Sequence, residues 1–216
     1  MSTPIRGIIF DYGGVISLPQ VKDELYPFLE KRFGISEKTV LEGYRKHRWA
    51  ADADLLSMEQ LYRKILEDNG VTRCLIPALL SYLADADFRS WAHRNPETPE
   101  WIRELKGQGY KIGILTNMPT SFLPYFDAVA HDVRAMADAE VVSGIHHLVK
   151  PDREIFDLMS RTIGIPAHEL LFFDDLERNV QGAVAAGFHA SLFTGVAAAR
   201  QVLATGYELL GKDSNA

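Results

Sequence analysis

Four short apolar segments of the chain each end in polar residues. They cover residues 7–10, 110–115, 169–173 and 188–193, and the residues that follow them are Asp11, Thr116, Asp174 and Thr194. Runs of about four to six mainly apolar residues that stop at polar residues are typical of strands buried on both faces of a sheet. The pattern therefore predicts four parallel strands whose carboxyl ends carry polar side chains.

Segments with helical spacing of apolar residues lie between these predicted strands. One begins at Thr98, the predicted N-cap, with Pro99 in the first helical position, and ends near Gly107. Two others cover residues 155–163 and 180–184. Alternating strands and helices predict an α/β fold with a doubly wound, parallel, Rossmann-like sheet, in which ligands bind at the carboxyl ends of the strands.

Residues 16–95 contain no strand-like run and several helical periods. Ser36 can cap one helix, and Ser57 forms a capping box with Gln60 ahead of another. Leucines at helical spacing over residues 75–83 indicate a third helix. We therefore predict three segments: a first part of the core over residues 1–15, an inserted helical cap over residues 16–95, and the remainder of the core over residues 96–216.

The predicted sheet brings four polar positions to one edge: Asp11, Thr116, Lys150 and the pair Asp174 and Asp175. Phosphoryl transfer requires an in-line nucleophile, a divalent cation and donors for the phosphoryl oxygens. Asp11 can attack as a carboxylate, and Asp11 and Asp175 offer the hard oxygen ligands that Mg²⁺ prefers. Thr116 offers a hydroxyl donor and Lys150 a positive charge. These residue types favour metal-assisted phosphoryl transfer.

Four stretches of the sequence resemble, in order, the motifs of the haloacid dehalogenase superfamily. They are Phe10-Asp11-Tyr12-Gly13-Gly14-Val15, Leu115-Thr116-Asn117, Lys150-Pro151-Asp152, and the stretch from Phe173 through Asp174 and Asp175 to Asn179. The match covers nearly all of the chain outside the predicted cap. The sequence is most similar to the branch that contains sugar-phosphate phosphatases and the phosphatase domain of epoxide hydrolases.

The resemblance implies a role for each matching residue. Asp11 would become a transient aspartyl phosphate, and Thr116 and Lys150 would hold the phosphoryl group. Mg²⁺ would be bound by Asp11, Asp175 and the backbone carbonyl of Gly13, with Asp174 serving the water shell of the metal. We also expect Asn117 and the cap residues His47 and Arg48 to contact the substrate.

The sequence departs from the family pattern at Gly13. Many members have a second aspartate at this position, and its side chain is the general acid and base. Glycine keeps the carbonyl for the metal and loses the proton shuttle, so we expect leaving-group protonation and water activation to be impaired unless another residue takes the role.

The resemblance implies a Mg²⁺-dependent phosphatase that hydrolyses a small phosphorylated metabolite such as a sugar phosphate. One alternative is a 2-haloacid dehalogenase, in which Asp11 would form an ester with carbon. Dehalogenases of the family need no metal and typically lack the carboxylate present here as Asp175. A second alternative is a catalytically weak binding or regulatory relative, because Gly13 lacks the acid and base.

The composition is that of an ordinary globular protein. The 216 residues carry 23 basic and 29 acidic side chains, a net charge of −6, and we find no basic cluster, so we expect no nucleic-acid partner. The sequence has no apolar run of the roughly 18 residues that cross a membrane, and we expect a cytoplasmic protein without a membrane partner.

The single cysteine, Cys74, lies among apolar residues, which predicts a buried or half-buried structural thiol in a helix.

Overall fold

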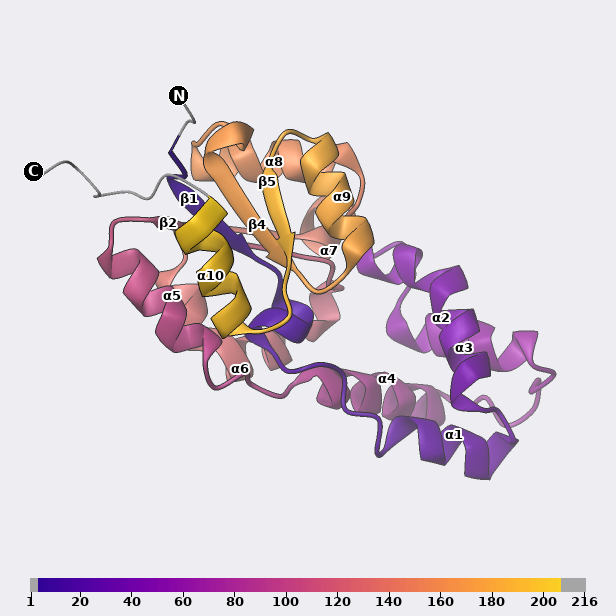
Figure 1. Cartoon of the computed structure of the whole chain (residues 1–216). Coiled ribbons are helices and arrows are strands. Elements are labelled where there is room, and N and C mark those ends of the chain that lie inside the picture. The colour runs from indigo at the N-terminus through magenta and orange to yellow at the C-terminus, as the bar shows by residue number, and fades with distance from the viewer. Residues whose placement is uncertain (1–3, 207–216) are drawn as a thin grey trace, which may run out of the picture.

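The computed structural model describes residues 4–206, which form a parallel sheet with helices on both faces and a separate group of helices (Figure 1). The strands are β1 (Gly7–Phe10), β2 (Lys111–Thr116), β3 (Ala139–Val142), β4 (Leu170–Asp174) and β5 (His189–Leu192). They are all parallel and lie in the order β3-β2-β1-β4-β5. The prediction of a doubly wound, Rossmann-like α/β sheet is confirmed.

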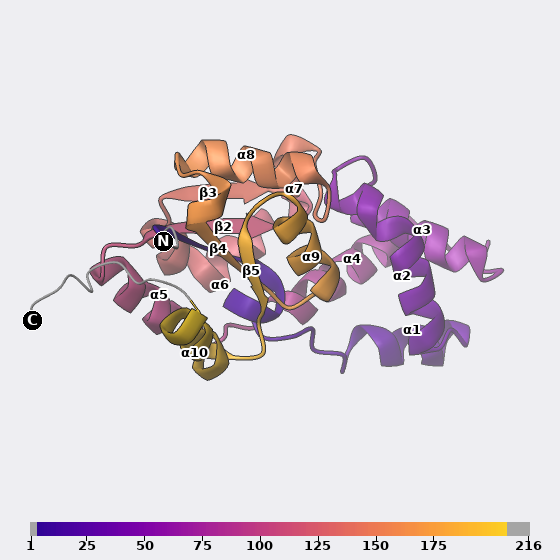
Figure 2. The same ribbon diagram turned by 45° about the horizontal axis from the view of Figure 1, so that its top comes forward.

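Helices cover both faces of this sheet (Figure 2). On one face lie α8 (Arg153–Ile163) and α9 (Glu177–Ala185), and on the other α5 (Thr98–Gly107), α6 (Leu123–Met136) and α10 (Val196–Gly206). Ile8 and Phe10 of β1 belong to the core on the α5 side, whereas Ile9 packs on the α8 side. Both faces of β1 are therefore buried, which explains its uninterrupted apolar sequence.

The second group of helices lies beyond the carboxyl ends of the strands (Figure 1). It consists of α1 (Leu25–Phe33), α2 (Glu37–Asp52), α3 (Met58–Asp68) and α4 (Pro77–Trp91), and we call it the cap. Ser36 accepts a hydrogen bond from the Thr39 backbone N–H at the start of α2, and the expected capping box of Ser57 and Gln60 is present at the start of α3. The two connections between cap and core meet at an isolated antiparallel bridge between Ser17 and Arg94.

The short strand β3 was not predicted from the sequence. It has four residues, begins with Ala139 and includes Glu140, which is half-buried at the edge of the sheet. The Glu140 carboxylate lies 2.8 Å from the guanidinium of Arg134 on α6. An edge strand that pairs on one side and carries a charged residue shows no continuous apolar run, and its pattern is therefore weak.

Two local predictions also differ from the structure. Glu97 occupies the cap position of α5, and the Thr98 hydroxyl donates instead to the Val15 carbonyl oxygen at 2.7 Å. Cys74 is exposed and precedes α4 with a left-handed backbone, at φ 64°, so the prediction of a buried helical thiol is wrong.

Within residues 4–206, no helix combines the length and the hydropathy needed to cross a bilayer.

Candidate active site

Asp11, Thr116 and Asp174 lie at the ends of three adjacent strands. Asp11 directly follows β1, Thr116 is the last residue of β2, and Asp174 is the last residue of β4. β1 lies between the other two strands, and the Asp11 backbone N–H donates to the Phe173 carbonyl oxygen at 2.9 Å. Parallel pairing therefore brings these side chains to one edge of the sheet, with Asp175 beside them.

Lys150 reaches the same edge from the loop before α8. Its side chain is fully buried, and its Nζ lies 2.9 Å from Asp11 Oδ1, 2.6 Å from Asp174 Oδ2 and 3.0 Å from the Leu115 carbonyl oxygen. An ammonium group has three N–H donors, and these three acceptors match them. Lys150 is thus a fixed buried cation between two carboxylates.

Asp174 is held by several donors besides Lys150. Its Oδ1 accepts from the Leu176 backbone N–H at 2.9 Å, and both of its oxygens lie 3.0 Å from Asn179 Nδ2. The side chain is completely buried. These contacts make Asp174 a residue that positions Lys150 and Asn179.

The turn η1 (Tyr12–Ile16), which follows β1, brings the chain against Asp175. Gly14 has φ +69°, a left-handed conformation that favours glycine, and a Cβ at this position would lie 2.6 Å from Asp175 Oδ2. Gly13 has an ordinary conformation, φ −64° and ψ 124°, and a Cβ there would lie 3.3 Å from Trp91 Cζ3 of the cap. The turn therefore requires glycine at position 14, whereas only the cap restricts position 13.

The carboxylates of Asp11, Asp174 and Asp175 can together hold a metal ion. Each offers an oxygen, and these oxygens all lie within 4.8 Å of one another. Because both oxygens of Asp174 accept from protein donors, whereas the described donors to Asp11 reach only Oδ1, Asp11 and Asp175 would be the better ligands. Asn179 Oδ1 is buried and has no hydrogen-bond partner among residues 4–206, as expected of an oxygen that faces a water ligand of a cation. These donors fit a hard divalent cation.

Burial and like charges raise the pKa of two of these carboxyl groups. The pKa of Asp11 rises from 3.8 to about 7 through burial, which Lys150 opposes and the charges of Asp174 and Asp175 reinforce. The pKa of Asp175 rises to about 6 through burial and then through the charge of Asp174. A cation bound between them would favour the ionised forms, so the cluster is arranged for a bound positive charge.

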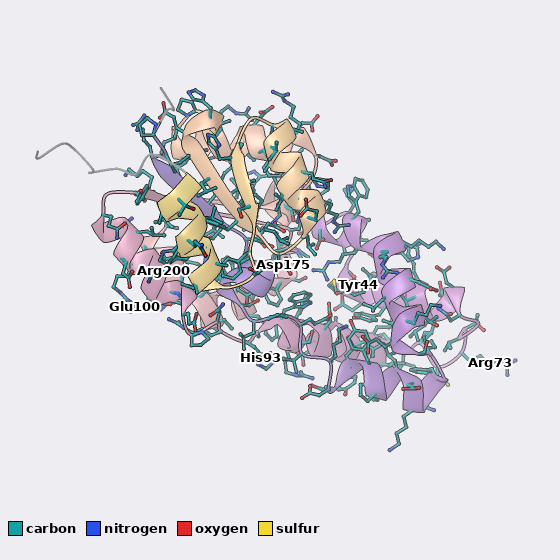
Figure 3. The ribbon with its side chains drawn as sticks, viewed as in Figure 1. Tyr44, Arg73, His93, Glu100, Asp175 and Arg200 are labelled. Atoms are coloured by element: carbon teal, nitrogen blue, oxygen red, sulfur yellow. The ribbon has the colours of Figure 1, made fainter. Side chains whose placement is uncertain are left out.

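A cavity of about 220 Å³ separates these core residues from the cap. Figure 3 shows Asp175 on the core and Tyr44 on the cap, on opposite sides of this space. The apolar and aromatic part of the lining consists of Tyr12, Phe88, Trp91, Met118, Phe122 and Leu176. The cap adds a polar group to the lining, which consists of Tyr44, Arg48, Asp52 and Asp87.

The polar group on the cap is one hydrogen-bonded network. Arg48 Nε donates to Asp52 Oδ1 at 2.6 Å, and Arg48 Nη1 donates to the Tyr44 hydroxyl. The Tyr44 hydroxyl donates to Asp87 Oδ2, which lies 3.5 Å from Arg48 Nη1. Sequence reasoning identified Arg48 and missed the other three. Tyr44, Arg48 and Asp52 recur every fourth residue on α2, so a polar stripe on one helix face was the available signal.

The structure brings Arg48 to the cavity and leaves His47 outside it. His47 Nε2 lies 2.9 Å from Asp68 Oδ2 on α3. This contact holds the His47 side chain against α3, and His47 is not among the residues that line the cavity. The expected contact of His47 with substrate is therefore not supported by its position.

Asn117 lines the cavity, and its amide also holds the backbone of Lys150. Asn117 Oδ1 accepts from the Lys150 backbone N–H at 2.8 Å, and Nδ2 donates to the Lys150 carbonyl oxygen at 2.9 Å. We expect this amide to contact the substrate. In the structure it holds the backbone of Lys150, so it also positions that residue.

The fold and the site define an α/β protein with an aspartate and lysine centre beneath a helical cap. The family model for haloacid dehalogenase-like hydrolases matches residues 5–187. The chain therefore belongs to the haloacid dehalogenase-like hydrolases, and the resemblance found in its sequence is confirmed.

Two curated relatives with phosphatase names match part of the chain. Phosphatase MT3486 of Mycobacterium tuberculosis (strain CDC 1551 / Oshkosh) is 29% identical over 113 residues, which cover 51% of this chain and 51% of the relative. Sesquiterpene phosphatase astK of Aspergillus oryzae is 35% identical over 92 residues, or 40% of this chain and 43% of the relative. The chain thus matches about half the length of these relatives.

Solved structures share the fold over most of the chain. A predicted HAD-like family hydrolase from Porphyromonas gingivalis has a TM-score of 0.68 at 22% identity, covering 93% of this chain and 98% of that one. The magnesium complex of a HAD family enzyme from Bacteroides thetaiotaomicron has a TM-score of 0.65 at 17% identity, covering 99% and 98%. L-2-haloacid dehalogenase from Xanthobacter autotrophicus has a TM-score of 0.66 at 19% identity, covering 95% and 85%. At these identities the likeness concerns the fold.

Proposed function

We propose that this protein is a Mg²⁺-dependent phosphatase that hydrolyses small phosphate monoesters through an aspartyl phosphate on Asp11. The observation that carries the proposal is the placement of Asp11, Lys150 and Asp175 on the core wall of the cavity between core and cap. The phosphatase names of two relatives and the magnesium complex of a structural neighbour support it. Residues 16–95 would act as the cap that excludes water from the site.

The proposed reaction begins with attack by Asp11 on phosphorus. Asp11 Oδ1 accepts from the Tyr12 backbone N–H at 2.7 Å and lies 2.9 Å from Lys150 Nζ, which fixes the carboxylate and leaves Oδ2 without a described protein donor. The buried Lys150 and the Thr116 hydroxyl would stabilise the negative charge of the phosphoryl oxygens. Asp174 keeps Lys150 in place, and Asn117 fixes its backbone.

Magnesium would be held by Asp11, Asp175 and the Gly13 carbonyl. Bound there, it would neutralise charge on the phosphoryl group. Asp174 would act on it through its neighbours, since its own oxygens are engaged by Lys150, Leu176 and Asn179. Oxygen ligands alone are the set that Mg²⁺ prefers over zinc.

The walls of the cavity favour a substrate with a small, partly apolar body. About 220 Å³ is below the roughly 300–1,000 Å³ of most pockets for drug-sized ligands. Phe88, Trp91 and Phe122 would pack against carbon atoms, and Arg48 would meet a hydroxyl or an anionic group. A sugar phosphate is one such substrate. The sesquiterpene phosphatase among the relatives adds terpenoid phosphates as a second class of substrate to test.

Phosphate release from a panel of sugar, terpenoid and aryl phosphates tests the proposal. We expect turnover with Mg²⁺, loss of activity in excess chelator, and recovery when Mg²⁺ is added back, because the carboxylates repel one another and the phosphoryl group without a cation. If the activity stayed complete in excess chelator, the metal would have no role. Halide release from a 2-haloacid under those conditions would establish the alternative dehalogenase reaction.

The raised pKa values predict how Mg²⁺ affects stability at different pH. In the unfolded chain these carboxyl groups ionise near their ordinary pKa, about 3.9, whereas the folded protein holds their protons up to about pH 7 for Asp11 and about 6 for Asp175. Their contribution to the stability of the metal-free protein is therefore present below about pH 4 and lost as the pH rises through 6 to 7.

Mg²⁺ binds the ionised carboxylates and restores this loss. We expect a larger increase in melting temperature on addition of Mg²⁺ at about pH 8 than at about pH 5. Calorimetry with and without the metal at both pH values measures the difference, and an equal or larger increase at the lower pH would contradict the assignment of the ligands.

A further inference from the structure

The cavity contains a carboxylate that the proposed mechanism leaves without a task. Attack on phosphorus is in line, so the leaving oxygen lies opposite Asp11 and faces the cap. Later, the water that hydrolyses the aspartyl phosphate must approach from this same side. Position 13 has no aspartate to give and take protons. Another group on the cap wall of the cavity must therefore donate a proton to the leaving oxygen and accept one from water.

Four cap groups on this wall carry exchangeable protons: Tyr44, Arg48, Asp52 and Asp87. Arg48 keeps its proton throughout, because the effect of burial, which lowers its pKa, is outweighed by Asp52, Tyr44 and Asp87, which raise the pKa well above an already high value. Burial raises the pKa of Tyr44 well above its ordinary value, and its hydroxyl is bonded to Asp87. Neither group can exchange protons readily at neutral pH.

Asp87 is also occupied. It is completely buried, its Oδ1 accepts from Gln20 Nε2 at 3.0 Å, and its Oδ2 accepts from Tyr44. Asp52 differs, because Arg48 engages Oδ1 and no partner among the described residues engages Oδ2. Its side chain is 9% exposed, and it lines the cavity.

Hydrogen bonds from three core residues dock residues 52–54 onto the core, beside the strands that carry the site. The Asp52 carbonyl oxygen accepts from Ser143 Oγ at 2.6 Å, and the same hydroxyl oxygen accepts from the Met118 backbone N–H at 2.8 Å, in the loop that follows Thr116. The Ala53 carbonyl oxygen accepts from His147 Nδ1 at 2.7 Å. Asp54 accepts from the backbone N–H and the hydroxyl of Thr120.

The docked segment fits the core closely. Asp54 has a left-handed backbone with φ 53°, an uncommon conformation for a residue with a side chain. A Cβ at Gly144 would lie 2.9 Å from the Met118 carbonyl oxygen and 3.1 Å from Asp54 Cγ. Hydrogen bonds and close packing against the core hold this end of α2 over the site and keep the uncommon backbone of Asp54 in place. They place Asp52 on the cap wall of the cavity that Asp11 lines from the core.

We infer that Asp52 is the general acid and base of the reaction, in the role that Gly13 cannot fill. In the first step the Asp11 oxygen bonds to phosphorus, the bond from phosphorus to the ester oxygen breaks, and Asp52 gives its proton to the departing oxygen. In the second step Asp52 takes a proton from water, the water oxygen bonds to phosphorus, the bond from phosphorus to Asp11 breaks, and inorganic phosphate leaves. This assignment rests on the proposed phosphatase function.

The charges around Asp52 suit a group that exchanges a proton. Burial raises its pKa, while Arg48 on its own helix and Lys150 and Arg178 from the core oppose the rise. The nearby Asp87 carboxylate on α4 interacts with it as a like charge. Asp52 is therefore held between cations that favour its ionised form and burial that favours its protonated form.

The Asp52→Asn variant tests the assignment with an activated aryl phosphate and Mg²⁺. Such a leaving group departs without a proton donor, whereas hydrolysis of the aspartyl phosphate needs an activated water. We expect a burst of the phenol equal to the enzyme concentration, followed by turnover about 10²- to 10⁴-fold slower than in the wild type. Mass spectrometry of the quenched enzyme should find phosphate on Asp11. Asp68→Asn, a cap variant outside the cavity, should behave as wild type.

Gly13→Asp provides a second and independent test. The φ and ψ angles at position 13 do not require glycine, and a Cβ there requires Trp91 to yield by a few tenths of an ångström. We expect Gly13→Asp to restore turnover to Asp52→Asn. The inference would be overturned if the wild type showed a burst and then a slow phase, and if Gly13→Asp accelerated that slow phase more than tenfold. This comparison uses a protein with Asp52 intact, so it does not depend on whether Asp52→Asn folds.

Two further outcomes separate this inference from the proposed function. If the burst amplitude and the turnover rate both fall in folded Asp52→Asn, Asp52 is a positioning residue for Arg48. If the kinetics are unchanged, Asp52 has no role in the reaction. Either result overturns the inference while the phosphatase function stands. Absence of phosphate release by wild type with Mg²⁺, across the whole panel of substrates, would instead overturn the proposed function.

Discussion

Replacement of Asp11 by asparagine is expected to reduce phosphate release by at least about 10³-fold. The amide has the shape of the carboxylate but no attacking charge. Both protein donors to Asp11, the Tyr12 backbone N–H and Lys150 Nζ, are close to Oδ1, so an asparagine can keep both contacts through its own Oδ1. We therefore expect Asp11→Asn to fold and to form no phosphoenzyme.

Steady-state phosphate release measures this loss, and the melting temperature shows that the fold persists. Asp157→Asn, on the exposed part of α8, is the matched control and should retain full activity. If folded Asp11→Asn kept a tenth of wild-type turnover, a metal-activated water would be the nucleophile, and the covalent route would be wrong.

The core strands and the residues at their ends could be predicted because both follow from local sequence. Strands buried on two faces give continuous apolar runs, as in β1 and β4. Parallel pairing then places the residues after them at one edge, whatever their separation in the chain. Asp11, Thr116 and the Asp174 pair were therefore found before their distances were known.

The cap side of the cavity could not be predicted in the same way. Helical spacing shows where a helix lies, but which face meets the core depends on how the whole cap is docked. The contacts of Ser143 and His147 with the end of α2 join residues more than 90 positions apart, and no local pattern marks them. His47 and Arg48 were thus equal candidates in the sequence, and the docking of α2 separates them.

The raised pKa values could not be predicted from the sequence either. Asp11 and Asp175 are ordinary carboxyl groups in the sequence, and their pKa values rise because folding buries them beside the charge of Asp174. The chemistry of this site therefore depends on the balance between one buried cation and three carboxylates.

Lys150→Met is the sharpest test of that balance, because methionine keeps much of the side-chain volume and removes the charge. Asp11 and Asp174 would lose a cation that is 2.9 Å and 2.6 Å away. Removing one partner of a buried ion pair typically costs about 3–5 kcal/mol of unfolding free energy, since the remaining charge stays buried. We expect a loss of this size in urea unfolding without metal, and a smaller loss with Mg²⁺.

The activity of Lys150→Met is expected to fall by about 10²- to 10³-fold even when Mg²⁺ keeps the protein folded, because the phosphoryl oxygens lose a preorganised cation. The matched control is Lys111→Met, an exposed lysine whose partner Asp138 lies at the opposite end of β2 from Thr116. Exposed ion pairs contribute about 1 kcal/mol or less, so this variant should change neither stability nor turnover appreciably. Equal effects in the two variants would mean that Lys150 contributes to the site no more than a surface charge does, and the electrostatic role assigned to it would be wrong.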